Sequence, residues 1–83
     1  MSTKQVTVHS FAQLKDYFEA QQEIHLPADA GIPQLIEVLR QQQPESSRLL
    51  DNCRLATTEE MIDQDYPLAH AAHIYFYPPS SGG

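Results

Sequence analysis

The first residues of the chain alternate between apolar and polar side chains, which is the pattern of a strand with one buried face. Val6 and Val8 share one side with Ser10, whereas Thr7 and His9 take the other side. We therefore predict a first strand that packs its valines against a core.

Further strand segments follow along the chain. Ile24 and Leu26 flank His25 in a second strand, which Pro27 closes. Three more strands are predicted at residues 53–57, 61–62 and 73–77. In the last of them, the alternation places the aliphatic and aromatic pair of Ile74 and Phe76 on the buried face.

A helical repeat separates the first two strands. Phe11, Leu14 and Phe18 recur at i, i+3 and i+7, so residues 12–20 are expected to form a short amphipathic helix.

The main core helix is expected at residues 32–43, where Pro33 occupies the first turn and loses no hydrogen bond there. Its apolar stripe consists of Ile32, Leu35, Ile36 and Leu39. Residues 48–51 and 65–68 are read as turns. The predicted order is strand, helix, strand, helix and three strands, which is an α+β domain with helices on one sheet face.

The sheet face that the helices leave uncovered is expected to carry His73, Tyr75 and Tyr77. Large amphipathic aromatics on an accessible strand suit an interface anchor, although ordinary packing on a sheet surface gives the same pattern.

Length and charge narrow the class of protein. The chain has 83 residues, which is enough for one domain, and a formal net charge of −6. Its basic residues are scattered, so nucleic acid is not an expected partner. The acidic residues Glu59, Glu60, Asp63 and Asp65 either steer the domain to a basic protein surface or simply keep it soluble. With no apolar segment for a membrane or a signal peptide, a cytoplasmic location is expected.

The domain has few residues that could carry cysteine or metal chemistry. Cys53 is the single cysteine and is expected to pack as a small apolar residue. A metal set could draw on His70 and His73 with Asp63 or Asp65, but this segment is short and leads into a strand, so no metal site is predicted. His9 and His25 are expected to be exposed.

The last residues carry the most distinctive chemistry. Gly82 and Gly83 have no side chains, so the carboxylate of Gly83 fits a narrow channel and is open to chemical activation. Pro78 and Pro79 favour an extended exit from the last strand. We therefore divide the chain into a domain at residues 1–79 and a flexible tail at residues 80–83, although two final glycines also arise by chance or from cloning.

Several segments together resemble a known family. They are Phe11-Ala12-Gln13, the helix sequence Ile-Pro-Gln-Leu-Ile-Glu-Val-Leu-Arg at residues 32–40, Asp65-Tyr66-Pro67-Leu68 and, above all, residues 76–83, Phe-Tyr-Pro-Pro-Ser-Ser-Gly-Gly. This combination resembles the small, sulfur-carrying subunit of molybdopterin synthase, in the family that also holds the thiazole sulfur carriers. The resemblance implies a β-grasp, ubiquitin-like fold in which the first and last strands pair in parallel.

The resemblance also implies a mechanism and partners. A ubiquitin-activating-like enzyme uses ATP to adenylate Gly83, and a sulfur donor converts the adenylate to a thiocarboxylate; no other cofactor is bound. The large, catalytic synthase subunit then receives the tail, and sulfur passes to a cyclic pterin precursor. The tail residues in the channel would be Pro78, Pro79, Ser80, Ser81 and Gly82, and the interface residues Tyr77, Tyr75, Met61 and Lys15. A two-plus-two hetero-oligomer is expected, with the small chain inactive alone.

The chain departs from the family pattern in two places. Ala56-Thr57-Thr58 replaces an Ala-Val-Asn step, and His70-Ala71-Ala72-His73 replaces an acidic turn with glycine. Both changes bear on contacts with a partner and leave the tail chemistry intact. The alternatives are a sulfur carrier for another thio-cofactor, such as the thiazole of thiamine, and a ubiquitin-like protein modifier.

Overall fold

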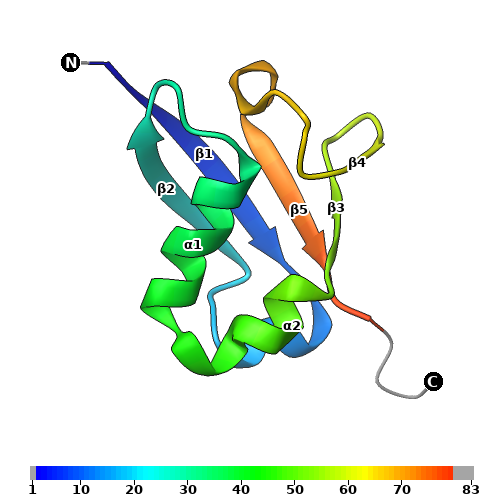
Figure 1. Cartoon of the computed structure of the whole chain (residues 1–83). Coiled ribbons are helices and arrows are strands. Elements are labelled where there is room, and N and C mark those ends of the chain that lie inside the picture. The colour runs from blue at the N-terminus through cyan, green and yellow to red at the C-terminus, as the bar shows by residue number, and fades with distance from the viewer. Residues whose placement is uncertain (1, 80–83) are drawn as a thin grey trace.

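A computed structural model describes residues 2–79, which form one mixed sheet covered by helices on one side (Figure 1). The sheet has five strands in the order β2-β1-β5-β3-β4. The strands are β1 (Thr3–Ser10), β2 (Gln21–Pro27), β3 (Arg54–Ala56), β4 (Met61–Ile62) and β5 (His73–Tyr77). The helices are α1 (Ile32–Gln42) and α2 (Ser47–Asp51), with short 3-10 turns η1 (Ala12–Asp16), η2 (Pro44–Ser46) and η3 (Leu68–His70).

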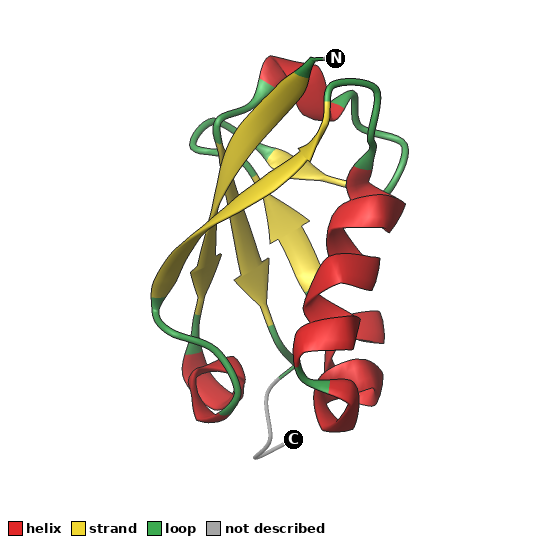
Figure 2. Cartoon of the chain, turned by 90° about the vertical axis from the view of Figure 1, so that its left-hand side faces the viewer, coloured by secondary structure: helices red, strands yellow, loops and turns green. Residues whose placement is uncertain are grey.

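The pairing of the strands confirms the expected topology. β1 runs antiparallel to β2 and parallel to β5, where Val8 pairs with Ile74. β5 also pairs antiparallel with β3, so the last strand lies in the middle of the sheet. Both views show α1 across one face of the sheet (Figures 1 and 2), which is the β-grasp arrangement that the family resemblance implied.

Helix α1 confirms the predicted core helix to within one residue. The N–H of Gly31 donates to Oε1 of Gln34 at 2.8 Å, and Pro33 lies in the first turn, where a missing N–H leaves no hydrogen bond unmade. The helix contributes Ile32, Leu35, Ile36 and Leu39 to the core. No helix in residues 2–79 is long and apolar enough to cross a membrane.

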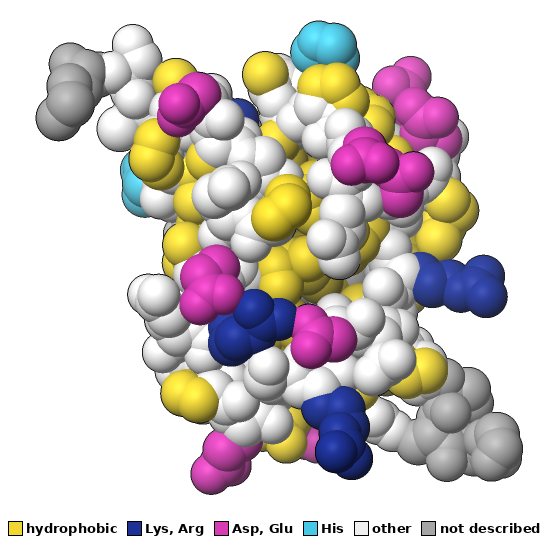
Figure 3. All heavy atoms as spheres, in the orientation of Figure 1, with side chains coloured by type: hydrophobic (Ala, Val, Ile, Leu, Met, Phe, Trp, Pro, Cys, Tyr) yellow, Lys and Arg dark blue, Asp and Glu magenta, His cyan; other side chains and the backbone are white. Residues whose placement is uncertain are grey.

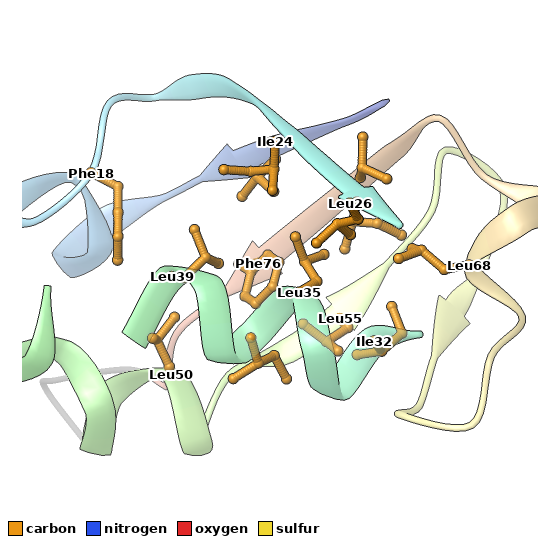
Figure 4. Packing of buried hydrophobic residues seen from close by; sticks show 14 of the residues in the cluster. Phe18, Ile24, Leu26, Ile32, Leu35, Leu39, Leu50, Leu55, Leu68 and Phe76 are labelled. Carbon is orange, nitrogen blue, oxygen red and sulfur yellow. The ribbon is translucent and has the colours of Figure 1, made fainter. Parts of the chain in front are cut away.

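The core lies between α1 and the sheet. Figure 4 shows Leu35 and Leu39 of the helix on the side that faces Phe76 of β5, with Ile24 of β2 above them. Phe76 and Ile74 are fully buried, as the alternation in the last strand predicted. Burial of each such side chain contributes about 1.5–3 kcal/mol to folding, so the central strand is also a main source of stability.

The predicted helix at residues 12–20 is wrong in type and length. The chain forms only the 3-10 turn η1, and it reverses at Ala12, which has a positive φ of 51°. Phe11 stays extended, with φ −127° and ψ 159°, so its side chain follows the alternation of β1 and is 37% exposed. Leu14 and Phe18 are buried as expected. A sharp reversal after the strand thus overrides the helical repeat.

The segment after α1 is also more ordered than a turn. Residues 47–51 form the short helix α2, which Arg40 ties to α1: its Nε donates to Oγ of Ser47 at 2.8 Å, and its guanidinium bridges Glu37 and Asp51. The N–H of Cys53 donates to the carbonyl of Leu50, so β3 begins one residue later than predicted.

Candidate functional site

One face of the sheet is not covered by an α-helix within residues 2–79. Figure 2 shows the long helix α1 on the other side of the strands, with shorter helical turns near the ends of the sheet. Because Ile74 and Phe76 of β5 point into the core, the intervening residues His73, Tyr75 and Tyr77 point to the open face. Tyr77 is 40% exposed and Tyr75 is half-buried, as the sequence predicted for this face.

Five rings form a continuous row on this open face, which we call the aromatic ladder: His73, His9, Tyr75, Phe11 and Tyr77. The ring of His9 stacks on Tyr75, with centroids 4.3 Å apart and planes 10° apart. Phe11 stacks on Tyr77 at 4.8 Å and 6°, and lies 6.1 Å from Tyr75. The parallel register of β1 and β5, which pairs His9 with Tyr75, brings these rings together.

The ladder begins with a histidine pair. Nε2 of His9 and Nδ1 of His73 are 2.9 Å apart and share a hydrogen bond. Partial burial, and secondarily the charge of His73, lower the pKa of His9 below its usual range, so the neutral ring is favoured. The residues considered for a metal set are not brought together in residues 2–79, where no group of three histidine, cysteine or acidic side chains converges. His73 instead meets His9.

The ladder extends across the sheet toward β4. Ala56 of β3 pairs with Tyr75 on one side and with Met61 on the other, so Met61 and Tyr75 share a face. Met61 is 56% exposed. Arg54 pairs with Tyr77 and is exposed beside it. Three of the four predicted interface residues therefore lie on one surface.

The fourth predicted interface residue, Lys15, is exposed on η1. This turn follows Phe11 directly, so Lys15 is connected to the Tyr77 end of the ladder by only a few residues. Within residues 2–79, no cation–π interaction joins Lys15 to the aromatic rings.

The chain leaves the sheet at the same end of the ladder. After Tyr77, Pro78 is half-buried and Pro79 is exposed, where it lines an open groove with Tyr17 and Arg48. The remaining predicted tail residues, Ser80, Ser81, Gly82 and Gly83, lie outside the described residues. The root of the tail thus follows the central strand β5.

The cysteine is a packing residue, as predicted. Cys53 packs against the core cluster, and its thiol donates to the carbonyl of Leu49 at 3.3 Å. Burial raises the pKa of this thiol to about 11, so little of it is thiolate at neutral pH. Cys53 is therefore a poor nucleophile.

Sequence reasoning did not assign His9, Phe11 or Arg54 to the site. The sequence predicts that His9 is exposed and that Phe11 belongs to a helical stripe, whereas His9 is half-buried and Phe11 has an extended backbone. The signal was present, because Thr7, His9 and Phe11 continue the period of two through the end of β1. Pairing that row with the aromatic row of β5 requires the register, which a single sequence does not contain.

Acidic side chains spread over the helical side of the molecule, and basic side chains lie among them in the middle and lower part of the view (Figure 3). This distribution agrees with the net charge of −6.

The β-grasp sheet, its open aromatic face and the central final strand define a small ubiquitin-like protein. The family model of the ThiS family matches residues 8–83. The chain belongs to the ThiS family, which confirms the resemblance noted in the sequence. No curated protein sequence matches the chain.

Three solved structures share the fold. SAMP1 from Haloferax volcanii superposes with a TM-score of 0.79 at 19% identity, covering 96% of this chain and all 100% of that one. A putative molybdopterin converting factor, subunit 1, from Pyrococcus furiosus gives 0.78 at 21% identity, covering 92% of this chain and 98% of that one.

The third structure is a complex of subunits 1 and 2 of the molybdopterin-converting factor from Helicobacter pylori. It gives a TM-score of 0.62 at 23% identity, covering 96% of this chain and 100% of the matched chain. At these identities the likeness establishes the β-grasp fold.

Proposed function

We propose that this chain is a sulfur carrier for molybdopterin biosynthesis, in which Gly83 is adenylated, converted to a thiocarboxylate and presented to a large synthase subunit. The observation that carries the proposal is the ThiS family match, which runs through Gly82 and Gly83. The names of two structural neighbours, both of the molybdopterin-converting factor, favour the pterin pathway over other thio-cofactors.

The chemistry assigns separate tasks to the chain and its partners. A carboxylate is a poor acyl donor until it gains a good leaving group, so an adenylating enzyme with ATP acts first. Attack of a sulfur donor then expels AMP and leaves the thiocarboxylate on Gly83. Its sulfur is soft and anionic, and so is nucleophilic without a neighbouring base. The carrier supplies the reagent, and the catalytic groups belong to the partners.

The fold suits this task because the tail root is fixed. Tyr77 ends a strand that is hydrogen-bonded on both sides, to β1 and to β3. Pro78 and Pro79 follow, and proline restricts φ, so the exit direction is set by the sheet. A carrier needs this rigidity at the root, because ordering a free chain costs roughly 1–2 kcal/mol per residue.

In this proposal, the large synthase subunit docks on the surface formed by the aromatic ladder and Met61. The large synthase subunit would cover Tyr75, Tyr77 and Met61, with Lys15 at the margin. One neighbour is a complex of two converting-factor subunits, which supports a heteromeric assembly for this chain. We place it in a two-plus-two hetero-oligomer, in which each tail enters the larger subunit.

The test is a reconstituted sulfur-transfer assay with the large synthase subunit, an adenylating enzyme, ATP, sulfide and the pterin precursor. Deletion of Gly83 should abolish transfer while the thermal melt stays unchanged, because the tail follows the core strands. Normal turnover by the deletion variant contradicts the proposal. Recovery of Gly83 joined to a lysine, with no transfer to the pterin, would instead identify a protein modifier.

A further inference from the structure

The histidine pair at the start of the aromatic ladder has no part in the proposed sulfur transfer. His9 lies on β1 and His73 on β5, and the register places them diagonally, since His9 pairs with Tyr75 and Thr7 pairs with His73. The two ring centroids are 5.2 Å apart with planes tilted by 33°. Two imidazoles thus converge on the open face from adjacent strands.

The backbone beneath this pair is firmly held. The N–H of Thr7 donates to the carbonyl of Ala72 at 2.8 Å, immediately before His73. The stack of His9 on Tyr75 holds one ring, whereas His73 is exposed, so its ring can turn once the hydrogen bond to His9 is broken. One fixed and one adjustable ligand on rigid strands are a favourable starting point for a metal site.

The two nitrogens are close enough to serve one ion after a small movement. Nε2 of His9 and Nδ1 of His73 are 2.9 Å apart, which is the length of the hydrogen bond between the two rings. Metal–nitrogen bonds to histidine are about 2.0–2.1 Å, so two nitrogens on one ion lie about 2.9–3.3 Å apart, and a turn of one ring can direct both lone pairs to the same point. Among divalent ions, the affinity of such nitrogen sites rises through nickel to copper, which favours these two ions.

We propose that Nε2 of His9 and Nδ1 of His73 form a two-nitrogen site for a divalent copper or nickel ion. The exposed His73 ring turns so that both lone pairs point to the ion. The ring that donated the shared hydrogen bond changes tautomer, moving its proton to its other nitrogen. Water fills the remaining positions, since no third histidine, cysteine or acidic side chain converges there within residues 2–79.

The surroundings favour a cation. The net charge of the chain is −6, and Glu23 on β2 pairs with Thr7, next to the histidines on the same face. The other titratable groups around the pair are Tyr75 beneath His9 and His70 on η3 before β5. Protons compete with the metal for the imidazoles, so binding should weaken as the pH falls.

The test uses the untagged full chain titrated with nickel chloride by calorimetry, and with copper sulfate by electron paramagnetic resonance. We expect one ion per chain and a copper signal with two nitrogen couplings. His9→Ala, His9→Gln and His73→Ala should each weaken binding at least tenfold and remove one nitrogen coupling. His25→Ala and His70→Ala are matched controls that should bind as the unaltered chain does.

Thermal melts identify any variant that fails to fold. Because His73 is exposed, His73→Ala should fold like the unaltered chain. The proposal is overturned if the unaltered chain shows no saturable one-to-one binding, or if folded His73→Ala binds as tightly as the unaltered chain. It is also overturned if His25→Ala or His70→Ala removes the binding.

Discussion

The ring of Phe11 stacks almost parallel on the ring of Tyr77, with centroids 4.8 Å apart and planes 6° apart. Phe11 follows the last residue of β1, and Tyr77 is the last residue of β5. The two rings meet because these strands run in parallel and end at the same edge of the sheet. Both are exposed, at 37% and 40%, so an aromatic surface stands where the chain leaves the domain.

Replacement of Tyr77 by alanine should weaken docking to the large synthase subunit by about 1–2 kcal/mol, because the change removes an anchor of the proposed interface. Tyr77→Phe keeps the ring and should bind nearly normally. Gln41→Ala, exposed on α1 across the sheet, is the control that should leave binding unchanged. Calorimetric titration measures all three, and equal affinities for Tyr77→Ala and Gln41→Ala would remove Tyr77 from the interface.

Two phenylalanines should respond very differently to truncation. Phe76→Ala should lower the free energy of unfolding by about 3–5 kcal/mol, because the ring fills the core between β5 and α1. Phe11→Ala removes a ring of the same size from the open face, so the loss should be at most about 1.5 kcal/mol, the value of an aromatic pair. Urea denaturation gives both values, and similar losses would contradict the assignment of the two faces.

Replacement of Ala12 by glycine should raise the free energy of unfolding of the protein. Its φ of 51° lies in the left-handed region, which costs roughly 1–2 kcal/mol for a residue with a Cβ. Glycine removes this strain but costs about 0.4–1 kcal/mol of chain entropy, so a net gain between about 0 and 1.6 kcal/mol is expected.

Ala28→Gly is the matched control for this substitution. Ala28 is an exposed turn residue, and positive φ among the described non-glycine residues is confined to Ala12. Glycine there relieves no strain, so Ala28→Gly should be destabilising. Thermal melts compare the two variants, and a lower melting temperature for Ala12→Gly would contradict the strained reversal after β1.

Cys53 should react slowly with iodoacetamide at neutral pH. Burial raises the pKa of its thiol from 9.0 to about 11, so the rate of alkylation should reach half its maximum near pH 11 in the folded protein. The raised value also means that the unfolded chain loses its thiol proton first, so the stability contribution of Cys53 falls as the pH rises through about 9 to 11.

The control for this pH profile is the same reaction in urea, where unfolding should return the midpoint to about 9.0. Mass spectrometry follows the alkylated fraction, and Cys53→Ser gives the background. A midpoint near 9.0 in the folded protein would show that the thiol is not buried against Leu49.

The strands and the core helix were predictable because the apolar residues within each segment repeat with the spacing of a strand or of a helix. The range of β5 and the inward direction of Ile74 and Phe76 follow from alternation alone. The prediction of a helix after β1 was wrong because Phe11, Leu14 and Phe18 have the spacing of a helical stripe. No residue near Ala12 indicates that the chain reverses there. A positive φ at alanine depends on tertiary packing, which outweighs local propensity.

The candidate site was predictable only in part for a similar reason. Tyr75 and Tyr77 stand out in one strand, but His9 and Phe11 belong to another strand far away in sequence. Their stacking on the tyrosines depends on the parallel register of β1 and β5. Such long-range register is set by the whole sheet and its core.

Tandem mass spectrometry of the C-terminal peptide tests the central claim most directly, after the full chain has been incubated with an adenylating enzyme, ATP and sulfide. The account predicts that one oxygen is replaced by sulfur at Gly83, that the exchange requires ATP, and that it is absent from the variant without Gly83. An unmodified Gly83 in a reaction that loads a known sulfur carrier alongside it would contradict the account.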